Sequence, residues 1–267
     1  MIKFIEKSHR YIDEKDRDLI SVSKFMEKFK EKVDWNKIAE RSAKKASSEG
    51  EIVTKEDILK KWANKRDKAA EIGTLFHSIR EMELIEANSC NFYDNNCQVR
   101  IGTTDNTYKY SIPINNLENN SVYPELMIYD EEHMICGQSD KVIVVDNFIH
   151  IWDFKTDAEI TFKGFSNKWT SARKLLKPLD HLDDCNGNIY SIKMSMYMYM
   201  LWKANKGRFK PGDIMIEHVH LKRDPDNDNL PVLENGRPVV LKIEQIKLPY
   251  RKKEVIAMLK MYDSKNI

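Results

Sequence analysis

The chain has 267 residues, of which 41% are hydrophobic and 10% aromatic, so it can bury a substantial core and is not an intrinsically disordered protein. Its 44 Lys and Arg residues are balanced by 42 Asp and Glu residues. The resulting net charge of +2 excludes a uniformly basic nucleic-acid-binding protein, so any basic surface must be local.

The predicted elements of the first half are a short hairpin and three helices. The hairpin covers residues 1–20, and the helices are predicted at about 21–33, 35–47 and 54–87. Ser21 or Ser23 would cap the first helix. Thr54 with Asp57 forms a capping-box pattern that opens the long third helix, in which Gly73 is the weakest interior position.

The second half of the chain is predicted to be richer in strands. Residues 88–121 contain many Asn, Asp, Ser and Thr residues and are predicted to form an irregular insertion with a strand or two. Strands are then predicted at 122–129, 134–145, 148–156, 213–221 and 238–246, and helices at 188–204 and 250–264. No repeat or linker divides the chain, which predicts a single α/β domain over residues 1–267, with residues 1–50 as an N-terminal elaboration.

No apolar run reaches the roughly 18 residues that a membrane span requires, and the first residues resemble neither a signal peptide nor a mitochondrial presequence. A soluble, intracellular protein is therefore expected. The four cysteines form no C-x-x-C pair, so they are interpreted as free thiols: Cys90, Cys97, Cys136 and Cys185.

The strands on either side of Asp146 and Asn147 are predicted to form a hairpin with a tight turn, because both residue types tolerate a positive φ. In the register of that turn, Asp140 lies opposite Asp153. Lys155 follows on the same face, since side chains two residues apart along a strand share a face. The hairpin is thus predicted to carry two carboxylates and one ammonium group side by side.

The preceding turn, within YDEEH, brings a further carboxylate to this face. If Glu131 and Glu132 lie at the centre of the turn, Glu125 is predicted to lie opposite Gln138 on the neighbouring strand. A slip of one residue would scatter the polar side chains over both faces of the sheet. The two turns together predict one polar cluster at one end of a three-stranded antiparallel sheet.

This cluster is predicted to need a cation. Carboxylates paired directly across a sheet are about 5 Å apart, and they repel each other by roughly 3 kcal/mol at an effective dielectric near 20. Lys155 offsets one charge at most, and oxygen ligands of this kind suit Mg²⁺ or Mn²⁺. The ammonium group could then orient or deprotonate a water and stabilise developing negative charge, which predicts metal-assisted phosphodiester hydrolysis. The alternative is a solvated strand end with an ordinary ion pair between Asp153 and Lys155.

Residues 136–156, CGQSDKVIVVDNFIHIWDFKT, resemble the G-x-x-D…D-x-K core of the PD-(D/E)XK nuclease superfamily. They are most similar to the branch that holds RecB-type recombination nucleases, the mitochondrial genome maintenance exonuclease and many phage exonucleases. That branch also carries a G-T-x-x-H-x-x-x-E pattern, which residues 73–81, GTLFHSIRE, match. A later Gln-x-x-x-Tyr pattern is matched only at Tyr197, because Lys193 stands where Gln is usual.

The resemblance implies a restriction-endonuclease-like core, in which a central mixed β-sheet with the antiparallel catalytic hairpin is flanked by helices. It also implies one or two Mg²⁺ or Mn²⁺ ions. Matched residue by residue, it implies Asp140 and Asp153 as metal ligands and Lys155 as the catalytic group that activates water or stabilises charge. His77 would be an additional metal ligand or an organiser of the site.

Further residues are implied in supporting roles. Glu125 matches an acidic position often seen before this core, and Tyr197 belongs to the later helical pattern. Glu81 either orients His77 or completes the polar shell of the site. Some family members carry an iron–sulfur cluster, but no Cys precedes residue 90 or follows residue 185, so no such cluster is expected here.

A basic stretch directly after the catalytic hairpin, residues 161–179, contains five cations and no acid. Its cations are Lys163, Lys168, Arg173, Lys174 and Lys177, and its aromatic residues are Phe162, Phe165 and Trp169. Such a stretch suits a single-stranded nucleic acid, with phosphates on the cations and bases stacked on the rings. The alternative is a solvated loop that buries its aromatic side chains in the core.

The leading hypothesis is a metal-dependent deoxyribonuclease, an exonuclease of DNA replication, recombination or repair that acts on single-stranded DNA or DNA ends. The resemblance covers most of residues 9–203 and extends to phage exonucleases, which implies a phage-encoded protein in the cytoplasm of a bacterium or an infected host cell. Two alternatives stay open. One is a structure-specific or restriction-type endonuclease on the same fold, and the other is a nucleic-acid-binding protein that does not cleave.

Overall fold

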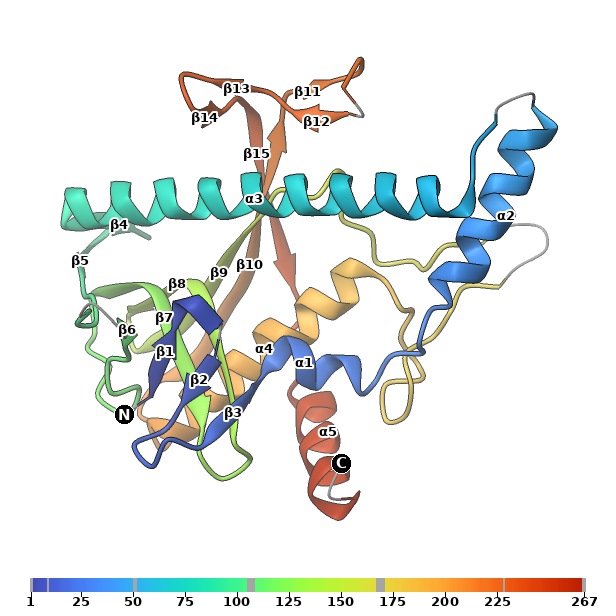
Figure 1. The fold of residues 1–267 in the computed structure, drawn as a ribbon. Coiled ribbons are helices and arrows are strands. Elements are labelled where there is room, and N and C mark those ends of the chain that lie inside the picture. Colours follow the sequence, from blue (N-terminus) through green and yellow to red (C-terminus); the bar gives the residue numbers. More distant parts are fainter. Residues whose placement is uncertain are drawn as a thin grey trace.

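The structure is a computed structural model, and it describes residues 2–8, 10–49, 52–104, 109–166, 171–227 and 229–265. It is a mixed α/β structure in which a large mixed β-sheet is flanked by helices (Figure 1), as the α/β prediction required. Among the described residues, no helix combines the length and the apolar character of a membrane-spanning segment.

The N-terminal part contains short strands followed by helices. The strands are β1 (Lys3–Ile5), β2 (Arg10–Ile12) and β3 (Asp18–Ser21), with a 3-10 turn, η1 (Glu6–Ser8), after the first. The helices are α1 (Val22–Glu27), α2 (Trp35–Ser48) and α3 (Lys55–Ala87). The predicted hairpin of β1 and β2 is confirmed, but α1 ends earlier than the predicted residue 33. Ser21 is its cap, because its hydroxyl accepts a hydrogen bond from the N–H of Lys24 at 3.2 Å.

The long helix α3 begins at the predicted capping box. The Thr54 hydroxyl accepts a hydrogen bond from the N–H of Asp57, and the Asp57 carboxylate accepts one from the N–H of Thr54. Gly73 lies inside this unbroken helix, where an added Cβ would be 3.4 Å from the Thr156 hydroxyl oxygen. The helix crosses one end of the sheet (Figure 1), and at Gly73 its backbone comes close to Thr156, which directly follows the last strand of the central hairpin.

The segment predicted to be an irregular insertion contributes three short strands: β4 (Ser89–Phe92), β5 (Asn95–Val99) and β6 (Lys109–Tyr110). β4 and β5 form a hairpin, β5 pairs in parallel with the next strand, β7 (Ser121–Asp130), and β6 pairs with β1. The insertion is therefore joined to the main sheet at two places. Residues 105–108 of this segment lie outside the described residues.

The predicted register of the central hairpin is confirmed. Its strands are β8 (Ile135–Val145) and β9 (Phe148–Lys155), and Val145 pairs with Phe148. Asp146 and Asn147 have φ values of 51° and 63°, so the two-residue turn has the positive φ that the sequence predicted. This two-residue turn fixes the register, so that Asp140 and Asp153 lie close together on adjacent antiparallel strands.

The predicted register between β7 and β8 is wrong by two residues. Their last pair joins Asp130 to Ile135, so the turn has four residues instead of two. The Asp130 carboxylate explains the longer turn, because it lies 2.8 Å from Nδ1 of His133 and accepts a hydrogen bond from the N–H of Glu132. Glu125 is consequently level with Asp140 rather than with Gln138, on the same face as predicted.

The C-terminal part begins with a buried helix and ends with a two-stranded arm and a last helix. These elements are α4 (Asn186–Ala204), β10 (Lys210–Leu221), β15 (Val240–Leu248) and α5 (Lys252–Lys265). Four short strands form two small hairpins at the tip of the arm: β11 (Arg223–Asp224), β12 (Leu230–Pro231), β13 (Leu233–Glu234) and β14 (Arg237–Pro238). Figure 1 shows the tip of the arm beyond α3, on the side away from α4.

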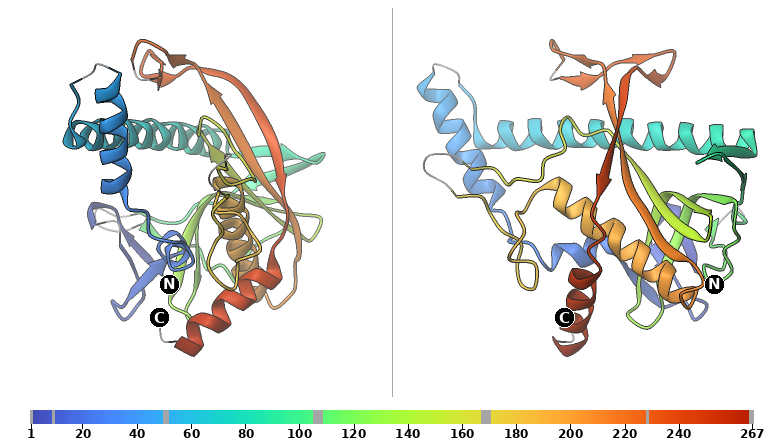
Figure 2. Two further views of the ribbon diagram at one scale, coloured as in Figure 1. Left: turned by 90° about the vertical axis from the view of Figure 1, so that its right-hand side faces the viewer. Right: turned by 180° about the vertical axis from the view of Figure 1, so that it is seen from behind.

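The strand order β15-β10-β9-β8-β3-β2-β1-β6 describes the main path of the sheet, which has 11 strands among the described residues. β10 is parallel to β9 and antiparallel to β15. α4 covers one face of strands β7 to β10, and the largest core cluster lies between them, while α3 crosses the end of the sheet (Figure 2). The candidate site lies near this end, where α3 meets the central strands.

Strand β8 changes partner along one edge, and this change creates space for the site. β3 pairs with Ile135 and Cys136, whereas β9 pairs with the stretch from Lys141 to Val145. Among the described strand pairs, residues 137–140 therefore have no partner on that edge. This gap lets side chains replace the ladder hydrogen bonds between β8 and β9.

Candidate active site

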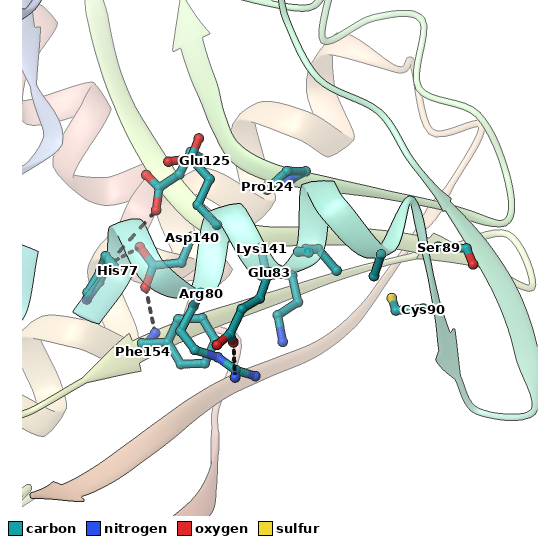
Figure 3. Close-up of a pocket in the computed structure, with 13 residues that line it drawn as sticks. His77, Arg80, Glu83, Ser89, Cys90, Pro124, Glu125, Asp140, Lys141 and Phe154 are labelled. Atoms are coloured by element: carbon teal, nitrogen blue, oxygen red, sulfur yellow. Dashed lines mark hydrogen bonds and ion pairs between the residues drawn. The ribbon is translucent and has the colours of Figure 1, made fainter. Parts of the chain in front are cut away.

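The structure brings the predicted catalytic residues of four elements together beneath α3. His77 comes from α3, Glu125 from β7, Asp140 from β8, and Asp153 and Lys155 from β9. Figure 3 shows His77, Glu125 and Asp140 pointing toward one another. Nδ1 of His77 lies 3.1 Å from Oδ1 of Asp140 and 4.0 Å from Oε1 of Glu125. The helix thus supplies the imidazole that closes the carboxylate cluster on the sheet.

Asp140 is held in place by the interrupted ladder. The β8–β9 ladder stops at the pair of Lys141 and Trp152, one step before Asp140 and Asp153. At that step, the Asp140 carboxylate accepts a hydrogen bond of 2.6 Å from the backbone N–H of Phe154 (Figure 3). One carboxylate oxygen is therefore fixed by the strand and the other faces His77.

Glu125 occupies an unusual backbone position. Its φ is 45°, in the left-handed region that is rare for residues other than glycine. Its carbonyl oxygen accepts a hydrogen bond of 3.1 Å from Nε2 of Gln138, which holds this conformation. Backbone strain of this kind is concentrated at functional sites, where the surrounding structure must maintain it.

Asp153 and Lys155 form a buried ion pair on β9. Their side chains are in direct contact and only 11% and 18% exposed. The Lys155 ammonium also donates a hydrogen bond to the carbonyl of Phe154 at 2.8 Å and lies 5.2 Å from the ring centre of Tyr190. The ammonium group is therefore held by three contacts, with Asp153, the carbonyl of Phe154 and the ring of Tyr190.

The electrostatics of the cluster are unbalanced. Burial, with the charge of Asp140, raises the pKa of Glu125 to about 8 and also raises the pKa of Asp153. Burial pushes the pKa of Asp140 upward as well, but Lys155 and His77 outweigh it, and this pKa ends below its ordinary value. When all three carboxyl groups are ionised, Lys155 and a protonated His77 provide only two positive charges for three negative ones, and an additional positive charge would relieve the repulsion.

The donor set fits a divalent cation. His77, Glu125 and Asp140 each offer one ligand atom, and these atoms lie within 4.8 Å of one another. Two carboxylate oxygens and an imidazole nitrogen, with further positions for water, suit Mn²⁺ or Mg²⁺. Asp153 was predicted to be a ligand as well, but in this structure its carboxylate is held on Lys155, beside the group of three.

Two pockets meet at the cluster. The first, of about 150 Å³, extends along α3 past Arg80 and Lys141 toward Cys90 (Figure 3). The second, of about 450 Å³, extends the other way past Gly73. Both are lined by His77, Glu81 and Glu125. An extended ligand that crosses from one pocket to the other would pass directly over the candidate metal ligands.

The position of Glu81 favours one of its two predicted roles. Glu81 lines both pockets, whereas the contacts of His77 described above go to Asp140 and Glu125. Burial and the charge of Asp140 raise the pKa of Glu125 most, the charge of His77 lowers it, and the negative charge of Glu81 adds a smaller upward contribution. Glu81 therefore lies in the wall that the two pockets share, as its predicted role in the polar shell of the site requires.

The position of the Tyr197 ring explains why residue 137 is a glycine. A Cβ atom on Gly137 would lie 2.5 Å from Cε1 and 2.7 Å from the hydroxyl oxygen of Tyr197, closer than such atoms can approach. The glycine of the G-x-x-D pattern is therefore needed because the ring of Tyr197 packs against the strand at this point. Tyr197 is buried in the main core cluster, so it supports the site from α4 through packing.

The structure adds two residues of α4 that the sequence analysis did not place in the site. Tyr190 stands over Lys155 and donates a hydrogen bond of 2.8 Å to Asp157. Burial and the nearby charge of Lys155 lower the pKa of Lys193, the residue at the usual Gln position. Tyr190, Lys193 and Tyr197 are spaced three and four apart, and this helical spacing was the available signal.

The basic segment is only partly free to bind a nucleic acid. Arg173 lies 3.3 Å from Asp184, and Lys174 lies 2.5 Å from Asp183, so both cations already have acidic partners. Lys163 is exposed, and its backbone N–H donates a hydrogen bond to the Thr161 hydroxyl. Lys168 and Trp169 lie outside the described residues. In the part of the segment that the structure describes, the exposed rings are those of Phe162 and Phe165, whereas Leu175 and Leu179 are buried in the core.

Comparison of the chain with known proteins leaves the site itself as the basis for a functional assignment. No model of a protein family matches the chain, and no curated protein matches it.

Proposed function

We propose that the chain is a metal-dependent nuclease that hydrolyses phosphodiester bonds of DNA on a restriction-endonuclease-like core of the PD-(D/E)XK type. The observation that carries the proposal is the convergence of Glu125, Asp140, Asp153, Lys155 and His77 at one end of strands β7 to β9. An ordinary ion pair at a strand end does not require three carboxylates, an imidazole and an ammonium group from four elements.

The protein residues would divide the chemical work. His77, Glu125 and Asp140 would hold a Mg²⁺ or Mn²⁺ ion, and Asp153 would join them as a ligand if its carboxylate turned away from Lys155. When bound, the ion supplies Lewis acidity toward a phosphate oxygen and lowers the pKa of a bound water. Lys155 would orient the attacking water and stabilise the negative charge that develops on the phosphate. Its burial excludes bulk water, which strengthens these electrostatic interactions.

The two pockets support a polymeric substrate. They lie on opposite sides of the carboxylate cluster and together provide a path along α3 for a nucleic-acid backbone. The resemblance to phage and RecB-type nucleases favours single-stranded DNA or DNA ends as the substrate, and exonuclease activity as the leading form of cleavage.

The purified full chain should be incubated with end-labelled single-stranded, double-stranded and circular DNA, with Mg²⁺, Mn²⁺ or a chelator. Metal-dependent shortening of linear DNA with intact circles would identify an exonuclease, and cut circles would identify an endonuclease. A protein that binds DNA without cutting any of these substrates would contradict the proposal.

A further inference from the structure

We propose a second metal site on the β10–β15 arm, formed by His218, His220 and Glu244, which takes a transition-metal ion that prefers imidazole ligands, with Zn²⁺ as the leading candidate. These three residues belong to neither the carboxylate cluster nor the pockets beside it. The proposal does not depend on the proposed nuclease function, because the ligands and the expected metal both differ.

The strand geometry places the three side chains on one face. His218 and His220 are two residues apart on β10, so they share a face, and their ring centres are 4.1 Å apart. Glu244 on β15 is the cross-strand partner of His218. Nε2 of His220 lies 3.3 Å from the Glu244 carboxylate, and one ligand atom from each residue lies within 4.8 Å of the others. This arrangement offers three ligand atoms around one point.

The hydrogen bond of His218 determines which of its ring nitrogens carries the proton. Nε2 of His218 lies 2.9 Å from the backbone carbonyl oxygen of Asp157, which can only accept a hydrogen bond. Nε2 must therefore carry the proton, and in the neutral ring Nδ1 keeps its lone pair for a metal. Metal-binding histidines almost always donate their second N–H to a carbonyl or carboxylate in this way. His218 is buried, so its ring is held in this orientation.

The ligand types select the metal. Two imidazoles and one carboxylate form a typical set for Zn²⁺, which is usually four-coordinate, so one position would remain for water or another ligand. Mg²⁺ prefers oxygen ligands and would not compete well here. His220 and Glu244 are 28% and 52% exposed, so an ion can enter from solvent. Lys242 lies 3.2 Å from Glu244, and its exposed ammonium group would have to move aside.

The site would lie next to the candidate active site. His218 is the parallel-strand partner of Lys155, so the two residues are on neighbouring strands about 4.8 Å apart in the sheet. Glu244, on the next strand β15, is the cross-strand partner of His218 and so continues the line from Lys155 across the sheet. A bound ion would join β10 to β15 where the arm leaves the central sheet, and it would stabilise the arm at its base.

The test is calorimetric titration of Zn²⁺ into the full-length protein, with excess Mg²⁺ present. An Asp140→Asn background removes a ligand of the carboxylate cluster and so weakens Zn²⁺ binding there, while the Asn side chain can still accept the hydrogen bond of Phe154. The variants His220→Ala and Glu244→Gln change partly exposed side chains, and His181→Ala changes an exposed histidine elsewhere as a matched control. Melting curves without metal should show that all variants fold.

We expect one Zn²⁺ ion per chain in the Asp140→Asn background and with His181→Ala. His220→Ala should weaken binding by at least about a hundredfold, since loss of even an outer-shell partner costs 10–100-fold. Glu244→Gln should also weaken it, and Lys242→Ala should strengthen it by removing a competing cation. Bound Co²⁺ should give an intense visible spectrum typical of tetrahedral coordination. Absence of Zn²⁺ binding, or equal affinity in His220→Ala and its parent, would overturn the proposal.

Discussion

Glu125 should make the stability of the metal-free protein fall as the pH rises. Its pKa is raised from 4.5 to about 8 by burial and by the charge of Asp140. Below the lower value, the carboxyl group is protonated in both the folded and the unfolded chain. Between the two values, the unfolded chain loses the proton and the folded protein keeps it, so unfolding becomes more favourable with each step in pH. Above about pH 8 the carboxyl group is ionised in both the folded and the unfolded chain, and its contribution to stability is fully lost.

The magnitude follows from the two pKa values. Their difference of about 3.5 corresponds to about 5 kcal/mol of unfolding free energy, at 1.36 kcal/mol for each pKa unit. This is an upper limit for Glu125, whose side chain is 20% exposed. Glu125→Gln keeps the shape but cannot titrate, so this variant should lose this part of the pH dependence. A bound divalent cation should have the same effect, because it stabilises the ionised carboxylate.

Urea denaturation between about pH 5 and pH 8 in the presence of a chelator measures this effect. The wild type should lose stability relative to Glu125→Gln as the pH rises, whereas Glu31→Gln, a change at an exposed residue of the same type, should follow the wild type. Addition of Mn²⁺ should bring the profile of the wild type closer to that of Glu125→Gln. Parallel pH profiles of the wild type and Glu125→Gln without metal would refute the reasoning.

Three further substitutions test the site. Asp153→Asn should lower Mg²⁺-dependent cleavage of labelled DNA by at least about a hundredfold, with little change in melting temperature. The control variant Asp146→Asn, in the turn of the same hairpin, should remain active. An active Asp153→Asn variant would contradict the assignment of Asp153 to the site. Lys155→Ala should abolish turnover without weakening Mn²⁺ binding in calorimetry, because loss of the ammonium group removes its repulsion of the metal ion. Weaker Mn²⁺ binding would instead show that Lys155 is needed to hold the metal ligands in position. Gly137→Ala should lower the free energy of unfolding, measured by urea denaturation, by about 1–3 kcal/mol. The double variant with Tyr197→Ala should lose less stability than the sum of the two single variants. Additive losses of stability would rule out the steric explanation.

The two turns of the central sheet show which parts of the site can be predicted from sequence. Asp146 and Asn147 define a two-residue turn by their own backbone preferences, so the β8–β9 register could be predicted without tertiary information. The turn before it depends on hydrogen bonds that the Asp130 carboxylate accepts within the turn and on its contact with Lys203 of α4 at 3.0 Å. That contact joins residues far apart in the sequence, and no local pattern indicates it.

Contacts between distant elements also explain what the sequence analysis missed. His77 could be recognised from its motif, but its distance to Asp140 depends on how α3 crosses the end of the sheet. Asp183 and Asp184 follow the basic segment closely, yet their pairing with its cations depends on an irregular backbone without helical or strand periodicity. The pairing of His218 with Glu244 spans the two small hairpins of the arm, so its register could not be counted across one turn.

The error in the β7–β8 register leaves the site on the correct face and increases the density of negative charge. Side chains alternate along a strand with a period of two, so a shift of two residues keeps Glu125 on its predicted face. The shift moves Glu125 along the strand by about 6.8 Å, from the level of Gln138 to the level of Asp140. Two carboxylates are thereby brought to the same level, with His77 within 4.0 Å of both. The corrected register therefore strengthens the case for a bound cation, because the third carboxylate lies where repulsion from Asp140 is greatest.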